Sequence, residues 1–463
     1  MRFPWQLLGI TAAVLSIVFV IDKQVSFNPE DRLDVSSSFK SETKTAKAKI
    51  HGNTELKPPI LWTSSSAVAE HVRSNATLPL LNEEVDGEDG RPLVVLHIGP
   101  HKTASSTIQC EFTHHYEVLY KEASFAYIGR QYPECQQKRS TRTRYQVDTR
   151  QLVSCLNRHD ADNRPCDKRS EWKDFETLLE ALARKKKNVI ISDEVFARMT
   201  TSSESMELLK ETLSRRFRVK VVVVYRRYYE WLFSMYNEKY KPLGRRSRYQ
   251  EWPGSHHGIE MRTFVDYYRR SLQYEGFGGY QLKAEKANLH PAEWLRQLWT
   301  LYFSHVVIFN MHQAGETLVT NFMHQVLPGT EDAIKYIRQH KAPYKVNPSV
   351  CLDYDILGVA AYRQGLVRKK LKRRQVSFAV EKLFKTFQTK HNKTISLPMV
   401  CLLQNEKDTL LNRSLALERT VLHDIGDKEQ HTLAFAEARN KFCNVDTKEV
   451  LANKAWQKFF SSL

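Results

Sequence analysis

The sequence lacks the residue patterns that mark metal-binding modules and most nucleic-acid-binding modules. Its seven cysteines form no CxxC pair and show no Cys/His spacing typical of a zinc site. No zinc-finger, RNA-recognition or heptad pattern is present, and there is no internal repeat. The standard phosphate-binding loop GxxxxGK[ST] is missing as well. These absences argue against a bound metal, a nucleic-acid reader and a standard P-loop kinase.

The composition is that of a large globular protein with an excess of positive charge. The chain has 463 residues, of which 41% are hydrophobic and 11% aromatic, enough to build a sizeable core. Its formal net charge is +18, with basic residues spread along the chain. Such a field attracts polyanions: nucleic acid, anionic lipid or acidic polysaccharide. Because no nucleic-acid motif accompanies the charge, nucleic acid is the weakest of these candidates.

The N-terminal segment predicts a membrane anchor. Phe3 to Ile21 is predominantly apolar, and as a helix it would extend about 28 Å, enough to cross a bilayer core. It ends in bulky residues rather than the small residues of a cleavage site, which favours a signal anchor over a cleaved signal. We expect residues 1–22 to form the cytosolic tip and anchor, and 23–91 a flexible luminal stem, polar and acidic near its end.

Luminal exposure agrees with two further features. N-x-[ST] sequons occur at Asn75, Asn392 and Asn412. All seven cysteines follow the anchor, where disulfides can form, and their odd number leaves at least one outside an intramolecular pair. The pairing cannot be read from the sequence, although Cys135, Cys155 and Cys166 lie in one polar region that they could staple.

The stretch from Pro92 to Gln109 carries the strongest chemical signal. Leu93 to Ile98 is an apolar run of strand length, and Gly99-Pro100 ends it. Residues 102–107 (KTASST) follow, a cation with small and hydroxyl residues where a helix should start. A strand, a tight turn, a lysine, hydroxyls and a helix N-terminus together favour phosphate binding, because backbone N–H groups and the helix dipole face the anion. A purely structural strand-turn-helix is the alternative.

A second strand-helix junction follows 124 residues later. Val219 to Tyr225 is strongly β-branched, Arg226 comes directly after it, and Ser234 follows on the next expected helix. Arg226 can form paired hydrogen bonds with a phosphate, and Ser234 can add a hydroxyl donor two helical turns further on. Taken alone, the arginine could be a solvated helix-start charge and the serine a packing residue.

The two junctions, in this order, resemble the donor-binding elements of sulfotransferases that use PAPS (3′-phosphoadenosine 5′-phosphosulfate). The loop is most similar to that of Golgi-type carbohydrate sulfotransferases, including algal members. The resemblance covers residues 92–463 and implies an α/β fold, a P-loop-NTPase-like three-layer α/β/α domain around a central parallel sheet. It implies PAPS as co-substrate, without a metal. It also implies a location in the Golgi membrane, as a single-pass type II protein with a luminal domain. The donor-binding residues that it implies are Lys102, Thr103, Ala104, Ser105, Ser106, Thr107, Arg226 and Ser234.

Transfer of a sulfuryl group to a sugar hydroxyl also needs a base. The segment 188–196 predicts a strand that ends in Asp193-Glu194, and ligands bind outside the carboxyl ends of such strands. The resemblance places the base near this strand, so we expect Glu194 in that role, with Asp193 second and Lys102 as the cation that assists transfer. Acids in the first turn of a helix also stabilise its dipole, which is the structural alternative.

Basic and aromatic segments suggest an acidic acceptor. Residues 240–257 read as a loop rich in cations and aromatic rings, which suits a saccharide site or a merely exposed loop. Arg368 to Arg374 is the densest basic run and reads as a solvated helix face, with polysaccharide docking as the alternative. Lys341 to Ser349 is the candidate for a third donor-binding segment. The loop departs from the family at Ala104, where many members have glycine. We expect that donor affinity suffers if this position has a positive φ.

Other functions remain open at this point. The chain could be a membrane-anchored polyanion-binding or glycan-binding protein without catalytic activity. A P-loop kinase lacks its motif here, and the luminal topology disfavours nucleic-acid binding. The carbohydrate acceptor itself cannot be identified from the sequence.

Overall fold

The computed structural model describes the body of the chain that follows the expected stem. The chain divides into two units, Met1–Ala69 and Glu70–Leu463, and every described residue belongs to the second. The described residues are 90–130, 135, 147–157, 165–199, 203–240, 251–252, 262–313, 317–340, 357, 360–367, 371–372, 389, 398–423 and 428–462.

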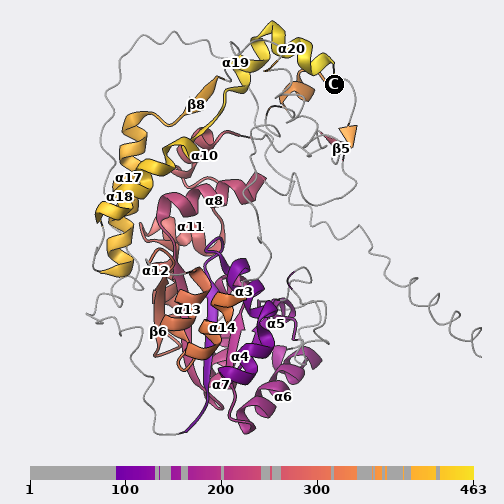
Figure 1. Ribbon diagram of the computed structural model, residues 1–463, viewed down its shortest axis with the longest axis vertical. Coiled ribbons are helices and arrows are strands. Elements are labelled where there is room, and N and C mark those ends of the chain that lie inside the picture. The colour runs from indigo at the N-terminus through magenta and orange to yellow at the C-terminus, as the bar shows by residue number, and fades with distance from the viewer. Residues whose placement is uncertain are drawn as a thin grey trace, which may run out of the picture. The chain divides into compact units, whose positions relative to one another are not determined.

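A five-stranded parallel sheet forms the centre of this unit (Figure 1). Its order is β2-β3-β1-β4-β6, and every neighbouring pair is parallel. The strands are β1 (Leu93–Gly99), β2 (Phe125–Gly129), β3 (Asn188–Ser192), β4 (Arg218–Tyr225) and β6 (Val306–Asn310). They are rich in Val and Ile and almost entirely buried, because a parallel sheet is covered on both faces. The expected α/β class with a central parallel sheet is therefore confirmed.

Helices cover both faces of the sheet. One face packs its alternate side chains, such as Val94 and Leu96 of β1, against α5 (Thr149–Asn157), α6 (Ser170–Arg184), α7 (Ser203–Ser214) and α12 (Pro291–Thr300). The other face, with Leu93 and Val95, packs against α3 (Ser105–His114), α4 (Tyr116–Glu122), α13 (Leu318–Val326) and α14 (Glu331–Gln339). The alternation along β1 follows from the two-residue period of a strand.

The connection that follows β1 crosses one face of the sheet, and the connections that follow its neighbours β3 and β4 cross the other. The chain after β1 passes through α3 and α4 on one face, whereas the chains after β3 and β4 pass through α7 and α12 on the other. Right-handed crossovers require this change of face, because β2 lies on one side of β1 and β4 on the other. In open α/β sheets the ligand crevice lies at such a switch, at the carboxyl ends of the strands. Here that position is the end of β1.

A second layer of helices packs on α8 (Tyr228–Tyr240). Its aromatic side chains share a core with α10, α17, α18 and the 3₁₀-helix η4, and a smaller core lies under α19 and α20. The remaining helices are α10 (Phe264–Ser271), α11 (Gly279–Lys286), α17 (Gln404–Leu422), α18 (Lys428–Glu437), α19 (Thr447–Ala452), α20 (Lys454–Ser461), η2 (Cys166–Lys168), η3 (Glu194–Arg198) and η4 (Ala438–Phe442). Short antiparallel pairs join β5 (Glu251–Trp252) to β7 (Leu371–Lys372) and β8 (Met399–Cys401) to β9 (Cys443–Val445).

Three disulfides tie loops to this framework: Cys110–Cys135, Cys155–Cys166 and Cys401–Cys443. The first joins α3 to the segment that follows β2, and the second lies within the polar region between β2 and β3. Cysteines 135, 155 and 166 therefore do staple that region, although Cys135 pairs with Cys110 outside it. Cys351 lies outside the described residues.

Two sequence interpretations need correction. The basic run at 368–374 was expected to form a helix face, but its residues Leu371–Lys372 form a strand. Its partner strand Glu251–Trp252 falls in the segment expected to be a loop.

Several predictions concern segments outside the described residues: the anchor, the stem, the sequons at Asn75 and Asn392, and the candidate third donor segment. Within the described part, no helix combines the length and apolar character needed to cross a membrane.

Candidate functional site

Polar residues follow every strand at the carboxyl edge, the edge of the sheet formed by the C-terminal ends of its five strands. The strand order places them in sequence along this edge: Arg130 after β2, Asp193-Glu194 after β3, the loop 99–104 after β1, Arg226-Arg227 after β4 and His312 after β6. Neighbouring strands are about 4.8 Å apart, so the edge carries one set of charged groups within reach of a single ligand.

The loop after β1 turns its backbone toward the crevice. Lys102 and Ala104 have φ angles of 71° and 60°, and Ala104 is the left-handed residue directly before α3. A left-handed residue followed by helical ones arranges successive N–H groups into an anion-binding concavity. The hydroxyl of Ser105, in the first turn of α3, is buried and has no hydrogen-bond partner among the described residues, whereas that of Thr103 donates to the carbonyl of Pro100 at 2.6 Å. Ala104 thus does occupy a position of positive φ.

Side chains from three other elements fix this loop. The backbone N–H of His101 donates to the hydroxyl of Tyr280 at 3.0 Å, and its carbonyl accepts from the indole N–H of Trp231 at 3.1 Å. The carbonyl of Lys102 accepts from Nη1 of Arg226 at 2.9 Å. The loop is therefore held in place before any ligand arrives, which lowers the cost of ordering it on binding.

Helix α8 supplies a carboxylate to each of the two expected phosphate-binding cations. Nζ of Lys102 lies 2.8 Å from Oε2 of Glu238, and Nε of Arg226 lies 3.3 Å from Oε2 of Glu230. Glu230, Ser234 and Glu238 are spaced four residues apart, so they share one side of α8. Ser234, half-buried, accordingly lies between the two carboxylates that reach Lys102 and Arg226.

The two acids after β3 have different surroundings. Asp193 is fully buried, and its oxygens accept from the Thr149 hydroxyl at 2.6 Å and from the Val195 N–H at 3.0 Å. Burial raises the pKa of Asp193. Glu194 packs closely against the β1 loop at Gly99, where even a methyl group would be crowded: a Cβ built on Gly99 would lie 3.3 Å from the Cβ of Glu194. Oε1 of Glu194 lies 3.2 Å from Nη1 of Arg130, and Oε2 accepts from the amide of Gln109 at 3.4 Å.

Buried histidines line the base of the site in their neutral form. Nδ1 of His290 accepts from the Ala292 N–H at 3.0 Å, so Nε2 carries the proton and donates to the Arg226 carbonyl at 2.9 Å. Burial lowers the pKa of His290 from 6.5 to about 3 and that of His312 from 6.5 to about 4. His312 uses Nε2 to accept from the backbone N–H of Arg227 at 3.0 Å. These rings fix the backbone at Arg226 and Arg227.

Burial likewise lowers the pKa of His101, from 6.5 to about 4, and neighbouring Lys102 adds to the effect. Its Nδ1 lies 3.9 Å from Oε1 of Glu194. The ring of His101 therefore lies beside the candidate base.

The structure brings together most of the residues expected from the sequence. Lys102 and Arg226 meet through the bond at 2.9 Å, residues 103–107 form the loop end and first turn of α3, and Glu194 abuts the loop at Gly99. Sequence reasoning missed Glu230 and Glu238, although their spacing around Ser234 was visible, and it missed Gln109, Arg130, Trp231 and Tyr280. Ile108, in the first turn of α3, is buried in the core.

Comparisons of this chain with models of protein families, with curated proteins and with solved structures found no match.

Proposed function

We propose that this protein is a sulfotransferase that moves the sulfuryl group of PAPS to a hydroxyl of a carbohydrate. The observation that carries the proposal is the bond from Arg226 to the carbonyl of Lys102. It joins two cation-bearing strand-helix junctions, which resemble the two donor-binding elements of this family, into one site at the switch point of the sheet.

The residues present fit a donor with two separate anionic groups. The β1 loop offers a concavity of N–H groups, the cation of Lys102 and the buried hydroxyl of Ser105 for the phosphosulfate. Residues 103–107 lie around these groups, with Ala104 contributing its backbone. Arg226, with Ser234 on the facing side of α8, would hold the 3′-phosphate. No group of His, Cys, Asp and Glu suited to a metal occurs among the described residues.

The donor supplies an electrophilic sulfur whose bond to the phosphate oxygen breaks as the acceptor oxygen bonds to sulfur. Lys102 and the N–H groups of the loop stabilise the negative charge that grows on the departing phosphate. Arg226, by holding the 3′-phosphate, fixes the position of the donor relative to Lys102 and Glu194. Glu194 accepts the proton that the acceptor hydroxyl loses, so charge and protons balance without a further reactant.

Glu194 suits the role of base better than Asp193. Both oxygens of Asp193 are engaged in capping η3 and bonding Thr149, and its side chain is sealed from solvent. Glu194 adjoins the β1 loop, and its side chain, although also paired with Arg130 and Gln109, keeps 10% of its surface exposed. The proposed catalytic groups, Lys102 and Glu194, thus follow β1 and β3, which are neighbours in the sheet.

We also propose that the domain is a P-loop-NTPase-like three-layer α/β/α fold. This agrees with the helices on both faces of the sheet and with the loop and helix that follow β1. We further propose that residues 1–22 anchor the protein as a type II protein of the Golgi membrane, with residues 23–91 as the stem and 92–463 as the luminal catalytic domain. The three disulfides agree with that compartment.

Sulfate transfer by the full chain tests the proposal. With ³⁵S-labelled PAPS and a panel of polysaccharides, the wild type should label at least one acceptor, and Lys102→Ala and Glu194→Gln should each lower the rate by about 10²-fold or more. A glycan-binding protein without activity would retain the polysaccharides on a column, in wild type and Lys102→Ala alike, and would transfer no label.

A further inference from the structure

Arg130 lies on the opposite side of the candidate base from the two cations assigned to the donor. The strand order runs from β2 through β3 and β1 to β4, so Arg130, Glu194, the Lys102 loop and Arg226 follow one another along the carboxyl edge. With strands about 4.8 Å apart, the end of β2 is roughly 10 Å from that of β1 and 14 Å from that of β4. If the donor spans β1 and β4, the acceptor must approach Glu194 from the side of Arg130.

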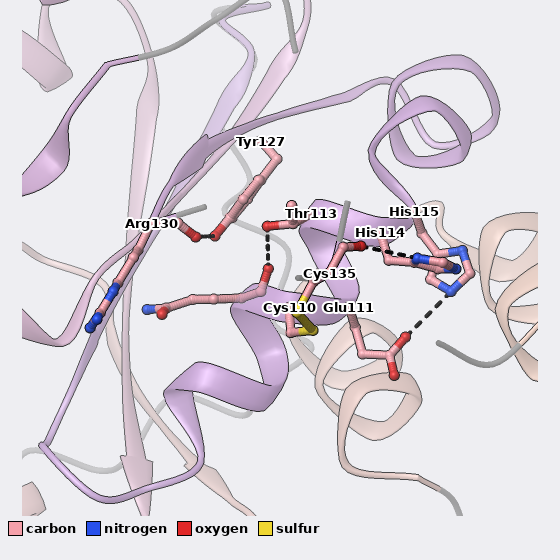
Figure 2. The surroundings of a disulfide bond; sticks show 9 residues. Cys110, Glu111, Thr113, His114, His115, Tyr127, Arg130 and Cys135 are labelled. Carbon is pink, nitrogen blue, oxygen red and sulfur yellow. Dashed lines mark hydrogen bonds and ion pairs between the residues drawn. A yellow bond between two sulfur atoms is a disulfide. The ribbon is translucent and has the colours of Figure 1, made fainter. Parts of the chain in front are cut away.

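The place of Arg130 is set by several bonds around it. Its backbone N–H donates to the Ser192 carbonyl at 3.3 Å, and its carbonyl accepts from the Tyr127 hydroxyl at 3.0 Å. The disulfide between Cys110 and Cys135 fastens the following segment to α3, and the guanidinium extends away from that disulfide (Figure 2). A fixed backbone with a side chain 30% exposed is a suitable arrangement for a ligand-binding arginine.

The contact between Arg130 and Glu194 presents a conflict that an acidic acceptor would resolve. The ion pair with Arg130 occupies Oε1 of Glu194 at 3.2 Å, an oxygen from which the carboxylate would otherwise be open to an acceptor hydroxyl. A carboxylate or sulfate on the acceptor would replace Glu194 on the guanidinium, and Arg130 would gain a ligand of matching planar or anionic geometry. Arg198 adds a further positive charge that acts on His101 beside the base.

We propose that Arg130 binds an anionic group of the acceptor, the carboxylate of a hexuronate or a sulfate ester, and that this binding releases Glu194 to act as base. The inference rests on the proposed function and names its substrate class: an acidic saccharide. Arg130 thereby determines specificity, while neutral saccharides leave the ion pair intact and the base occupied.

Calorimetric titration of the full chain, saturated with PAP (the desulfated donor product), tests this binding without relying on turnover. The probes are oligogalacturonate, a sulfated galactan oligosaccharide and the neutral galactan. Arg130→Ala should weaken binding of the anionic probe by about 10- to 100-fold and leave neutral binding unchanged. Glu194→Gln should strengthen anionic binding by about two- to fivefold, because the competitor for Arg130 is removed. Lys185→Ala, which removes an exposed cation at the opposite edge of the sheet, should change neither.

The outcomes separate this inference from the function beneath it. The proposal is supported if an anionic probe binds, and binds more weakly to Arg130→Ala and more tightly to Glu194→Gln. The probe that binds more tightly then shows whether the anionic group is a carboxylate or a sulfate. Equal affinity for the neutral galactan, binding of no anionic probe, or weakening by both variants overturns it. If PAP fails to bind, the sulfotransferase proposal fails, and titration of the same probes without PAP still decides whether Arg130 holds an anionic saccharide.

Discussion

The guanidinium of Arg226 donates to the backbone carbonyl of Lys102 at 2.9 Å, which joins the end of β4 to the loop after β1. The two residues are 124 positions apart in the chain. Because β1 and β4 are neighbours in the sheet, the two loops open into one crevice. The same arginine also pairs with Glu230, as Lys102 pairs with Glu238. A ligand phosphate must therefore compete with two carboxylates of α8.

Glu238→Gln should bind PAP two- to fivefold more tightly than the wild type. The Lys102–Glu238 pair is partly exposed, and such pairs contribute roughly 0.2–1 kcal/mol, which the incoming anion must overcome. Titration of each full chain with PAP measures the change. Glu437→Gln, an exposed substitution on α18, is the matched control. Weaker binding in Glu238→Gln alone would mean that Glu238 positions Lys102 rather than competing with the donor.

Ala104→Gly should stabilise the protein by about 0.5–1 kcal/mol. Ala104 has φ 60° and ψ 18°, where a Cβ is strained by about 1–2 kcal/mol, and glycine removes that strain at a smaller cost in unfolded-chain entropy. Equilibrium unfolding in urea measures the change, and PAP affinity should rise with it. Ala287→Gly is the control, because Ala287 has φ −81° at the end of α11 and glycine there should destabilise. Equal losses in both variants would refute a strained loop.

The free energy of unfolding of His290→Asn should fall less than that of the wild type when the pH is lowered. The pKa of His290 is lowered by burial from 6.5 to about 3, so the folded protein holds this ring neutral while the unfolded chain protonates it. Its contribution is complete above pH 6.5 and is lost as the pH falls toward 3. Between pH 7.5 and pH 5 the loss is about 2 kcal/mol, since each unit below 6.5 costs about 1.4 kcal/mol.

Asparagine can still cap α12 at the Ala292 N–H, but it does not titrate. Urea unfolding of both proteins at the two pH values gives the comparison. The difference in unfolding free energy between wild type and His290→Asn should shrink by about 2 kcal/mol on acidification. An unchanged difference would show that His290 is not held neutral in the fold.

The sequence was most informative where local pattern and chemistry coincide. The strands 93–98 and 219–225 were predictable because buried parallel strands are continuous β-branched runs, and the structure has each of them with one added residue. Lys102 and Arg226 were recognisable because each follows such a strand. The direct contact between Lys102 and Arg226 could not be predicted, since it depends on the order of strands in the sheet.

Partners that act across the fold could not be predicted in the same way. Tyr280 and Trp231 hold His101 from positions 179 and 130 residues away, and nothing in their local sequence indicates this. The sign of φ at Ala104 was left open, because alanine gives no local sign of a left-handed backbone. Leu371–Lys372 was misread since a run of cations gives little indication of secondary structure, and its strand depends on pairing with Glu251–Trp252.

The most direct test of the central claim is titration of the full chain with PAP, beside Arg226→Ala, Arg226→Lys and the exposed control Arg184→Ala. The account predicts binding by the wild type and the control, a loss of at least tenfold in Arg226→Ala, and a smaller loss in Arg226→Lys, which keeps the charge without the paired geometry. Absence of PAP binding by a wild-type protein shown by circular dichroism to be folded would contradict the sulfotransferase account.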